Sequence, residues 1–473
     1  MTPWASTRQV ASRRAQSNLV RLLVAVGLGA ASAGLAGAGR REVEVSKLPG
    51  AQNEPAIAID PSNDRILVAG SNSFREGSMR VYSSIDGGST WTRSLLYQPP
   101  ASFLSTCASD PGVAVDLTGR QYYSFIRTTP CRTGHPRLFV ASRSGSKAAW
   151  GTPVLVNPLR ASVADDKPAI AVDASPSSPY RNRVYAAWSR LSHNQVLSIV
   201  LSHSDDAGRT WSRIVKVNRT GDQETYASVA VSRNGTVYVT WDDTSRYRLA
   251  IARSTDGGAH FAPERQAEAF SIVPIPSCGS GILIRASLRV CVHANPIVSV
   301  DRSLGPRSGR VYLSYTKIDS GGDEGVFVKA FDGRLRPLLG GPNDEGVAVA
   351  PAPRRTRPDQ FWPASAVDSS SGALWVCFYD TSGDPARERV FYACTVSRNG
   401  GRTWARRVRA ASIASDETQP GADLRQYGDY EGLAVANGVA HPIWTDSRDL
   451  RTFAEEIYTT RLAGFDVPAP ARR

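Results

Sequence analysis

The chain has 473 residues, with 41% hydrophobic residues, 40 Gly and 30 Pro. This composition favours a turn-rich, folded, all-β protein and argues against a helical or disordered one. The formal net charge is +13, from 56 Lys and Arg against 43 Asp and Glu. Such a charge can attract anionic partners. No basic helix and no cluster of Arg with aromatic residues points to nucleic acid, so we expect no nucleic-acid partner.

The first 38 residues are typical of a secretory signal peptide. Their basic region contains four Arg and no acid: Arg8, Arg13, Arg14 and Arg21. An apolar run covers Leu22 to Leu35, and Ala36-Gly37-Ala38 offers a cleavage site of small residues. The residues after Arg13-Arg14 are not those of a twin-arginine signal, so the export route stays open. No later apolar stretch is long enough to cross a bilayer. We expect a secreted or extracytoplasmic monomer without a membrane span.

The cysteines agree with export. Six of them fall into three pairs that are local in sequence: Cys107 with Cys131, Cys278 with Cys291, and Cys377 with Cys394. An even number of cysteines in an exported chain favours disulfides, although other connectivities are possible. None of the spacings is that of a zinc site. We therefore expect three structural disulfides.

A unit recurs along the mature chain, with starts roughly 56 to 69 residues apart. Each unit begins with a short apolar strand, usually ending in Asp, and continues after a turn with an aromatic-rich strand. The seven short strands lie at 54–60, 110–116, 167–173, 227–231, 295–301, 362–368 and 431–435. Long self-similar periods of about four strands are the signature of a β-propeller. Alternating Ala with Val or Ile suits the innermost strand of a blade, where neighbours crowd around the axis.

The last unit is incomplete. Only three strands follow Glu431, while the strand-like segment Glu42 to Val45 has no partner near the start of the mature chain. Pairing the two would close the ring and hide the open sheet edges. The sequence therefore predicts an all-β fold, a single β-propeller of seven four-stranded blades closed by an N-terminal strand, with a six-bladed ring as the alternative. We expect a signal peptide at 1–38, the propeller at 39–466 and a short tail at 467–473.

A second motif, Ser-x-Asp-x-Gly-x-Thr-Trp, marks the connection between the third and fourth strands of four units. Its copies are centred on Asp86, Asp206, Asp256 and Asn399. The third copy ends in His-Phe, and the fourth carries Asn in place of Asp. Gly supplies the positive φ of a tight turn, and the carboxylate can accept hydrogen bonds from turn amides. We expect these four residues to be structural.

These four copies resemble the Asp-box (BNR) repeat of the sialidase-like β-propellers, a superfamily that includes exo-alpha-sialidases. The resemblance covers nearly the whole mature chain as a fold. It implies an exo-acting glycoside hydrolase that takes a glycan or glycoconjugate at the central mouth of the propeller. The alternative is a non-catalytic propeller that binds glycan or protein there, because the repeat itself only closes a turn.

The catalytic pattern of sialidases is matched less well. That family carries an Arg-Ile-Pro motif near its start, three Arg that bind the substrate carboxylate, an acidic acid/base, and a nucleophilic Tyr with a Glu partner. This chain has no Arg-Ile-Pro motif, and its seven units depart from the six blades of the sialidase catalytic fold.

Candidate site residues lie in the loops that enter the inner strands and leave the second strands, because these loops gather on one face. Carboxylates, Arg and aromatic rings there suit a sugar, although acids at strand ends are also ordinary turn formers. The catalytic candidates are Asp166, Glu431 and Tyr430. The substrate-binding candidates are Arg75, Arg127, Arg425, Arg448, Asp359, Trp362 and Asp380. We expect no cofactor and select no metal ligands. Calcium near Asp242–Asp243 or Asp380–Asp384 stays open as an alternative, although no regular ligand spacing supports it.

Overall fold

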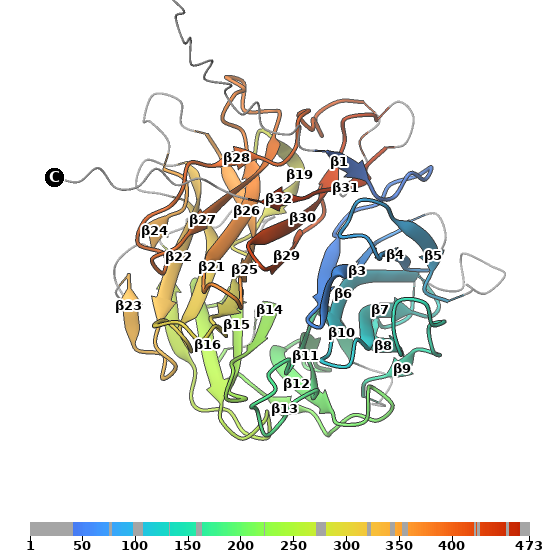
Figure 1. The fold of residues 1–473 in the computed structure, drawn as a ribbon, viewed down its shortest axis with the longest axis vertical. Helices are drawn as coiled ribbons and strands as arrows, with labels where there is room; N and C mark the ends of the chain where they lie inside the picture. Colours follow the sequence, from blue (N-terminus) through green and yellow to red (C-terminus); the bar gives the residue numbers. More distant parts are fainter. Residues whose placement is uncertain are drawn as a thin grey trace, which may run out of the picture. The chain divides into compact units, whose positions relative to one another are not determined.

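The computed structural model describes residues 41–74, 78–97, 107–131, 133–157, 163–221, 223–270, 281–318, 323–340, 346–351, 358–420, 422, 426–450 and 454–463. The described residues belong to one compact unit. Its strands make seven antiparallel blades arranged in a ring, which confirms the predicted seven-bladed β-propeller (Figure 1). Among the described residues, no helix has the length and hydrophobicity needed to cross a membrane.

The first four blades follow the chain, each from the inner strand outward. Blade 1 consists of β2 (Ala56–Asp60), β3 (Asn63–Ser71), β4 (Arg80–Ser84) and β5 (Thr92–Leu95). Blade 2 consists of β6 (Cys107–Val115), β7 (Gln121–Thr128), β8 (Arg137–Arg143) and β9 (Val154–Leu155). Blade 3 consists of β10 (Ala164–Val172), β11 (Val184–Leu191), β12 (Leu197–Ser204) and β13 (Val215–Lys216). Blade 4 consists of β14 (Glu224–Val231), β15 (Val237–Asp243), β16 (Arg248–Ser254) and β17 (Arg265–Ala269).

A hairpin of β18 (Ile282–Ile284) and β19 (Ser287–Val292) precedes the remaining blades. Blade 5 consists of β20 (Ile297–Val300), β21 (Val311–Ile318), β22 (Glu324–Phe331) and β23 (Pro337–Leu339), and β24 (Val347–Ala348) also pairs with β22. Blade 6 consists of β25 (Gln360–Val367), β26 (Leu374–Asp380), β27 (Phe391–Ser397) and β28 (Val408–Arg409). Blade 7 consists of β29 (Gly432–Ala436), β30 (Val439–Asp446), β31 (Glu456–Thr460) and β1 (Glu42–Glu44), and β32 (Leu462–Ala463) pairs with β30.

The ring closes through its N-terminal strand, as predicted. β1 pairs antiparallel with β31, placing Glu42 opposite Thr460 and Glu44 opposite Tyr458 (Figure 1). Directly after β1, Val45 is fully buried in a core cluster that contains residues of both blade 7 and blade 1. The two ends of the propeller are therefore joined by side-chain packing as well as by strand pairing.

The second strands form the core between neighbouring blades. Every residue of β15 and β26 is buried, and Trp188, Trp241 and Trp444 on second strands are among the largest fully buried side chains. Large rings fill the widening gap between twisted blades, while the inner strands stay small because adjacent blades nearly touch there. A Cβ atom at Gly112 of β6 would lie 2.5 Å from Ser124 Oγ and 3.1 Å from Ile170 Cγ2. The sequence pattern of each unit is thus a consequence of radial position.

The Ser-x-Asp turns are held by their own side chains. Ser84 Oγ donates to Asp86 Oδ1 (2.8 Å), and Thr90 N donates to the same oxygen (2.9 Å). Partial burial raises the pKa of Asp86, but the hydrogen bonds from Thr90 and Ser84 outweigh it and keep this pKa below its usual value. Gly87 N donates to Arg65 O (2.9 Å) near the start of β3, beside the turn between β2 and β3. The turn at Asp86 therefore lies on the face of that first turn, away from the loops that enter the inner strands.

We expect Asp206→Ala to lower the free energy of unfolding by about 1–2 kcal/mol, because the carboxylate accepts bonds from Ser204 Oγ (2.8 Å), Thr210 N (2.8 Å) and Thr210 Oγ1 (2.7 Å). Urea denaturation followed by tryptophan fluorescence measures the change. The neighbouring Asp205→Ala is the matched control, since the Asp205 side chain is 62% exposed and makes an ion pair with Arg183. Equal losses for the two variants would show that the turn hydrogen bonds do not stabilise the fold.

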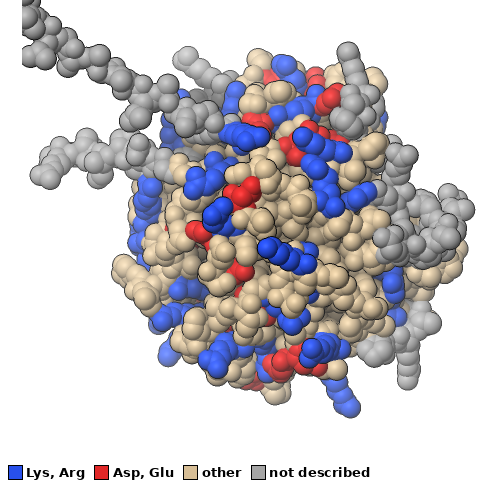
Figure 2. Space-filling model, turned by 45° about the vertical axis from the view of Figure 1, so that its right-hand side comes forward, with Lys and Arg blue, Asp and Glu red and all other residues tan. Residues whose placement is uncertain are grey.

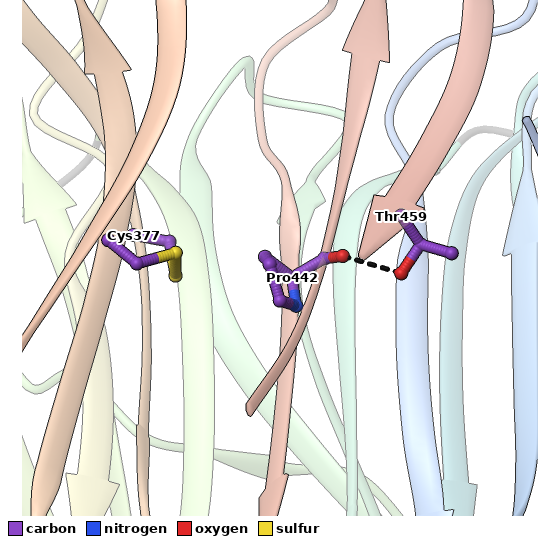
Figure 3. The surroundings of a disulfide bond; sticks show 4 residues. Cys377, Pro442 and Thr459 are labelled. Carbon is purple, nitrogen blue, oxygen red and sulfur yellow. Dashed lines mark hydrogen bonds between the residues drawn. A yellow bond between two sulfur atoms is a disulfide. The ribbon is translucent and has the colours of Figure 1, made fainter. Parts of the chain in front are cut away.

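Two of the predicted disulfides are present, Cys107–Cys131 and Cys377–Cys394. Cys377 on β26 lies directly opposite Cys394 on β27, so the second bridge crosses a strand pair inside blade 6. Figure 3 shows Cys377 with its surroundings in blade 7, where Thr459 Oγ1 donates to Pro442 O (2.7 Å). Cys291 is also disulfide-bonded, whereas its predicted partner Cys278 lies outside the described residues.

The surface carries interspersed charges. On the face drawn in Figure 2, Lys and Arg lie among Asp and Glu and form no continuous basic patch. Much of the positive charge is paired locally, as in Arg183–Asp205 and Arg336–Asp332. On this face the basic residues are therefore spread out among acidic ones.

Candidate functional site

The inner strands enter the ring through a repeated strained residue. Six non-glycine residues at equivalent positions have a positive φ between 41° and 62°: Glu54, Asp110, Lys167, Tyr226, Asn295 and Trp362. Five of them precede a proline, and Tyr226 precedes Ala227. We call these six residues the entrance ring. A left-handed conformation costs a residue with a side chain roughly 1–2 kcal/mol, so its repetition around one axis points to a shared structural or functional demand.

The strain coincides with β-bulges. The pairing of inner and second strands shifts register between Ser109 and Gly112, Asp166 and Ala169, Thr225 and Ser228, and Phe361 and Ala364. A bulge inserts an unpaired residue and changes the direction of its side chain. At these positions it makes side chains from separate blades converge at the mouth of the channel.

Lys167 and Asp429 form the centre of this convergence. Lys167 Nζ from blade 3 binds Asp429 Oδ2 from the entry loop of blade 7, and their side chains are 16% and 18% exposed. Tyr226 OH donates to Asp429 Oδ1 (3.3 Å), and Lys167 Nζ lies 5.7 Å from the centroid of the Tyr226 ring. Asn295 Nδ2 donates to Asp429 O (3.3 Å). An ion pair therefore bridges blades 3 and 7, with side chains of blades 4 and 5 against it.

Two further carboxyl groups belong to the same network. Asn72 Nδ2 donates to Glu54 Oε2 (2.9 Å), and Asp429 N donates to Glu54 Oε1 (3.1 Å). Asp110 Oδ2 accepts from Lys167 N (3.1 Å), and Asp110 N donates to Asn72 Oδ1 (3.0 Å). The network thus continues from blade 3 through blade 2 to blade 1 and returns to blade 7.

The carboxyl groups titrate differently from one another. Burial raises the pKa of Glu54 to about 8, although Lys167 opposes the shift. Burial and the nearby Asp110 carboxyl raise the pKa of Asp166 to about 7. Burial also acts on Asp429, but the Lys167 ammonium outweighs it and lowers the pKa of this carboxyl. Near neutral pH the mouth therefore holds an ionised carboxylate close to carboxyl groups that retain a proton, an arrangement found in acid–base catalysis.

Glu54→Gln should flatten the pH dependence of stability. Folding raises the pKa of this carboxyl from 4.5 to about 8. Its contribution to the free energy of unfolding is therefore fully present below pH 4.5 and is lost as the pH rises through 8. One such proton changes the free energy of unfolding by up to about 1.4 kcal/mol per pH unit between these values. Chemical denaturation at several pH values between 5 and 8 measures the slope. A slope as steep in the variant as in the natural protein would contradict the assignment.

Glu431 and Tyr430, two of the predicted catalytic residues, lie beside this network. They line a cavity of about 250 Å³ together with Lys167, Tyr226 and Asn295. Glu431 is buried and accepts from Tyr379 OH (2.5 Å) and Thr445 N (3.0 Å), and burial raises its pKa well above the usual value. The Tyr430 hydroxyl is buried and has no hydrogen-bond partner among the described residues. A Tyr–Glu pair is therefore present, but its tyrosine is the fully buried Tyr379.

The predicted substrate-binding residues are held in other contacts. The Arg127 guanidinium lies 3.9 Å from the centroid of the Phe139 ring, and Arg448 binds Asp446 and Glu42. Asp359 accepts from Arg387 Nε (2.9 Å), and Asp380 pairs with Arg407 Nε (2.9 Å). Trp362 belongs to the entrance ring by its backbone, but its side chain is fully buried in an aromatic cluster with Phe361, Tyr379 and Tyr427. Arg75 and Arg425 lie outside the described residues.

The structure thus brings Asp166, Tyr430 and Glu431 to one mouth and adds Lys167, Asp429, Glu54 and Tyr226 to them. Sequence analysis did not select these four. For Lys167, Glu54 and Tyr226 the signal was the position before Pro, or before Ala in unit four, at the start of an inner strand. Asp429 lies in the entry loop of blade 7 and has no such signal. Among the described residues, the cation that interacts with the carboxyl groups of Asp429 and Glu54 is Lys167 and not an Arg. The described residues contain no group of three or more His, Cys, Asp or Glu placed to hold a metal ion.

Proteins similar to this chain were found among solved structures alone. No family model matches the chain. A search of curated proteins also gave no match. Among solved structures, the chain is similar to the Hadza microbial sialidase Hz136, with 13% identity and a TM-score of 0.49 over 87% of this chain and 66% of that one. It is similar to a Trypanosoma rangeli sialidase in complex with sialic acid, with 14% identity and a TM-score of 0.47 over 77% and 59%.

A third similar structure is the NanB sialidase from Streptococcus pneumoniae in complex with a chlorobenzyl ammonio-ethanesulfonate, with 12% identity and a TM-score of 0.46 over 72% of this chain and 66% of that one. The chain spans less than two thirds of the length of each of these three proteins. At such identities the likeness concerns the fold alone. In architecture the chain is a seven-bladed β-propeller.

Proposed function

We propose that the protein is an exported glycoside hydrolase of the Asp-box propellers that cleaves a glycan at the mouth beside the entrance ring. Export is supported by the signal-like N-terminus and by the disulfides. The observation that carries the hydrolase proposal is the pairing of Asp166, whose pKa burial raises to about 7, with Asp429, whose carboxylate Lys167 keeps ionised. Glycoside hydrolysis by two carboxyl groups needs one that carries a proton and one that is ionised.

In this proposal each group has one task. Asp166 transfers its proton to the glycosidic oxygen as the bond between that oxygen and the anomeric carbon breaks. Asp429 accepts a proton from the water that adds to the anomeric carbon, so that both products leave with complete hydroxyl groups. Lys167 is a positioning residue that keeps Asp429 ionised and oriented. The unpartnered Tyr430 hydroxyl and the Tyr226 ring offer the sugar a hydrogen-bonding group and an apolar face.

A non-catalytic glycan- or protein-binding propeller is the second candidate. One observation favours it: Glu54, Asp110 and Asp429 already have hydrogen-bond partners inside the network. Carboxyl groups satisfied in this way can serve to hold the entrance ring in its strained conformation. The mouth would then recognise its ligand through Tyr430 and the neighbouring loops without turnover.

A panel of fluorogenic glycosides tested with the mature protein separates the two candidates. Asp166→Asn and Asp429→Asn should each lower kcat by about 10²–10⁴-fold while the protein stays folded. Asp64→Asn is the matched control, because Asp64 lies at the start of β3, at the opposite end of the channel. Turnover that is unchanged in both mouth variants would refute Asp166 and Asp429 as the catalytic pair. Absence of turnover, with glycan binding that Tyr430→Phe weakens, would favour the binding propeller.

A further inference from the structure

The channel has a second cavity at the end opposite the entrance ring. Its volume is about 650 Å³, and residues of all seven inner strands line it. The lining also includes the first residues after several inner strands, such as Pro61, Ala174 and Ser369. We call this space the lower cavity. Its volume is within the range of about 300–1,000 Å³ that is typical of sites for small molecules.

Backbone groups supply much of the polarity of the lower cavity. Each inner strand pairs with a neighbour on one side only, so its other edge carries N–H and C=O groups without strand partners. A few of these groups are used between blades: Ser228 Oγ accepts from Val298 N (3.2 Å), and Ser299 Oγ donates to Ser365 O (3.0 Å). The remaining strand-edge N–H groups are donors for a bound molecule.

Arg302 adds one charged donor to this wall. Asp301 is the first residue after β20, and Arg302 is the second. Arg302 lines the lower cavity. In the other blades the residue after the inner-strand Asp or its equivalent is Pro61, Leu117, Ala174, Arg233, Ser369 or Asn437. Arg233 does not line the cavity, so among the cavity-lining residues that the structure describes, Arg302 is the cation.

The Arg302 guanidinium has no hydrogen bond or ion pair with any described residue. Burial lowers its pKa, and the charge of Asp173 opposes this shift. Asp173 itself accepts from Ser175 N (3.2 Å) and from Ser178 Oγ. The acids on the cavity wall are also occupied: Asp60 accepts from Ser62 N (2.8 Å), and Asp64 accepts from Asn437 Nδ2 (3.0 Å). A partly desolvated guanidinium without a partner is unfavourable.

We propose that the lower cavity binds a small anion through an oxyanion group, a carboxylate or a phosphate, with the Arg302 guanidinium as its principal partner. Arg presents a planar fork of N–H donors that matches either group in bidentate geometry. Strand-edge N–H groups complete the set of donors. The lower cavity adjoins the mouth cavity along the same channel, but Arg302 lines the lower cavity alone. The proposal therefore does not depend on whether the mouth cleaves glycans.

Isothermal titration calorimetry of the mature protein with inorganic phosphate and, separately, with citrate tests the proposal. We expect at least one of the two anions to bind with millimolar or tighter affinity, and the identity of that anion distinguishes a phosphate ligand from a carboxylate ligand. Arg302→Gln should weaken binding by about tenfold or more, the equivalent of one charge-assisted pair. Arg233→Gln should bind as the natural protein does, because Arg233 holds the same position in blade 4 outside the cavity.

Three results would overturn the proposal. These are binding of neither anion, equal affinity in Arg302→Gln and the natural protein, and loss of binding in Arg233→Gln. A shift of the melting temperature by the bound anion, present in the natural protein and absent in Arg302→Gln, gives a second readout. Asp429→Asn should leave anion binding unchanged, which separates this site from the mouth.

Discussion

Deleting residues 42–46 should open the propeller and lower the free energy of unfolding by at least about 4 kcal/mol. The deletion removes β1 from the edge of blade 7 and takes the fully buried Val45 out of the core that blade 7 shares with blade 1. It also removes Ser46 Oγ from the buried Glu456 carboxyl and Glu42 from Arg448. Denaturant unfolding monitored by circular dichroism measures the loss.

The same segment supplied in trans gives a control. A peptide of residues 40–50 can add back as the outer strand of blade 7, because main-chain pairing with an exposed sheet edge is a common mode of peptide recognition. It should restore the melting temperature in a concentration-dependent way. A peptide with Val45→Asp should not restore it, since Val45 is buried. A deletion variant as stable as the full chain would show that the ring closes without β1.

The fold could be predicted from the sequence because its determinants are local and repeated. A strand of alternating small residues next to the axis, an aromatic strand behind it, and a turn closed by Ser and Asp side chains recur in fixed order. The same part of each repeat therefore lies at the same distance from the axis of the ring. The unpaired segment 42–45 and the short seventh unit together predicted β1 on β31, although more than 400 residues separate Glu42 from Thr460.

Less of the candidate site could be predicted from the sequence, because the site depends on contacts across the axis. Lys167 and Asp429 are 262 residues apart, and their pairing requires the bulge that redirects the entrance residue of blade 3. The residue pattern gives no measure of that redirection. For the same reason Trp362, selected as a substrate-binding residue, has a fully buried side chain. Arg448, selected as a ligand for an anion, makes an ion pair with the N-terminal strand.

Glu268→Ala should lower the free energy of unfolding by about 3–5 kcal/mol, because it leaves two lysines without their carboxylate in a buried site. Glu268 on β17 of blade 4 accepts from Lys317 Nζ (2.6 Å) on β21 and pairs with Lys329 Nζ (2.5 Å) on β22. Tyr315 OH donates to the same carboxylate (2.8 Å). The exposed fractions of the Glu268, Lys317 and Lys329 side chains are 3%, 11% and 0%.

The exposed pair Arg336–Asp332 provides the control for this prediction. Its Arg side chain is 71% exposed, so Arg336→Ala should change stability by less than about 1 kcal/mol. Replacing Glu268, Lys317 and Lys329 together by Met or Leu should recover much of the loss, since apolar side chains of similar volume need no buried counter-charge. Guanidinium unfolding of the four proteins measures these differences. If Glu268→Ala lost no more stability than Arg336→Ala, the network would not be what holds blade 4 against blade 5, and the apolar core between these blades would have to stabilise their contact alone.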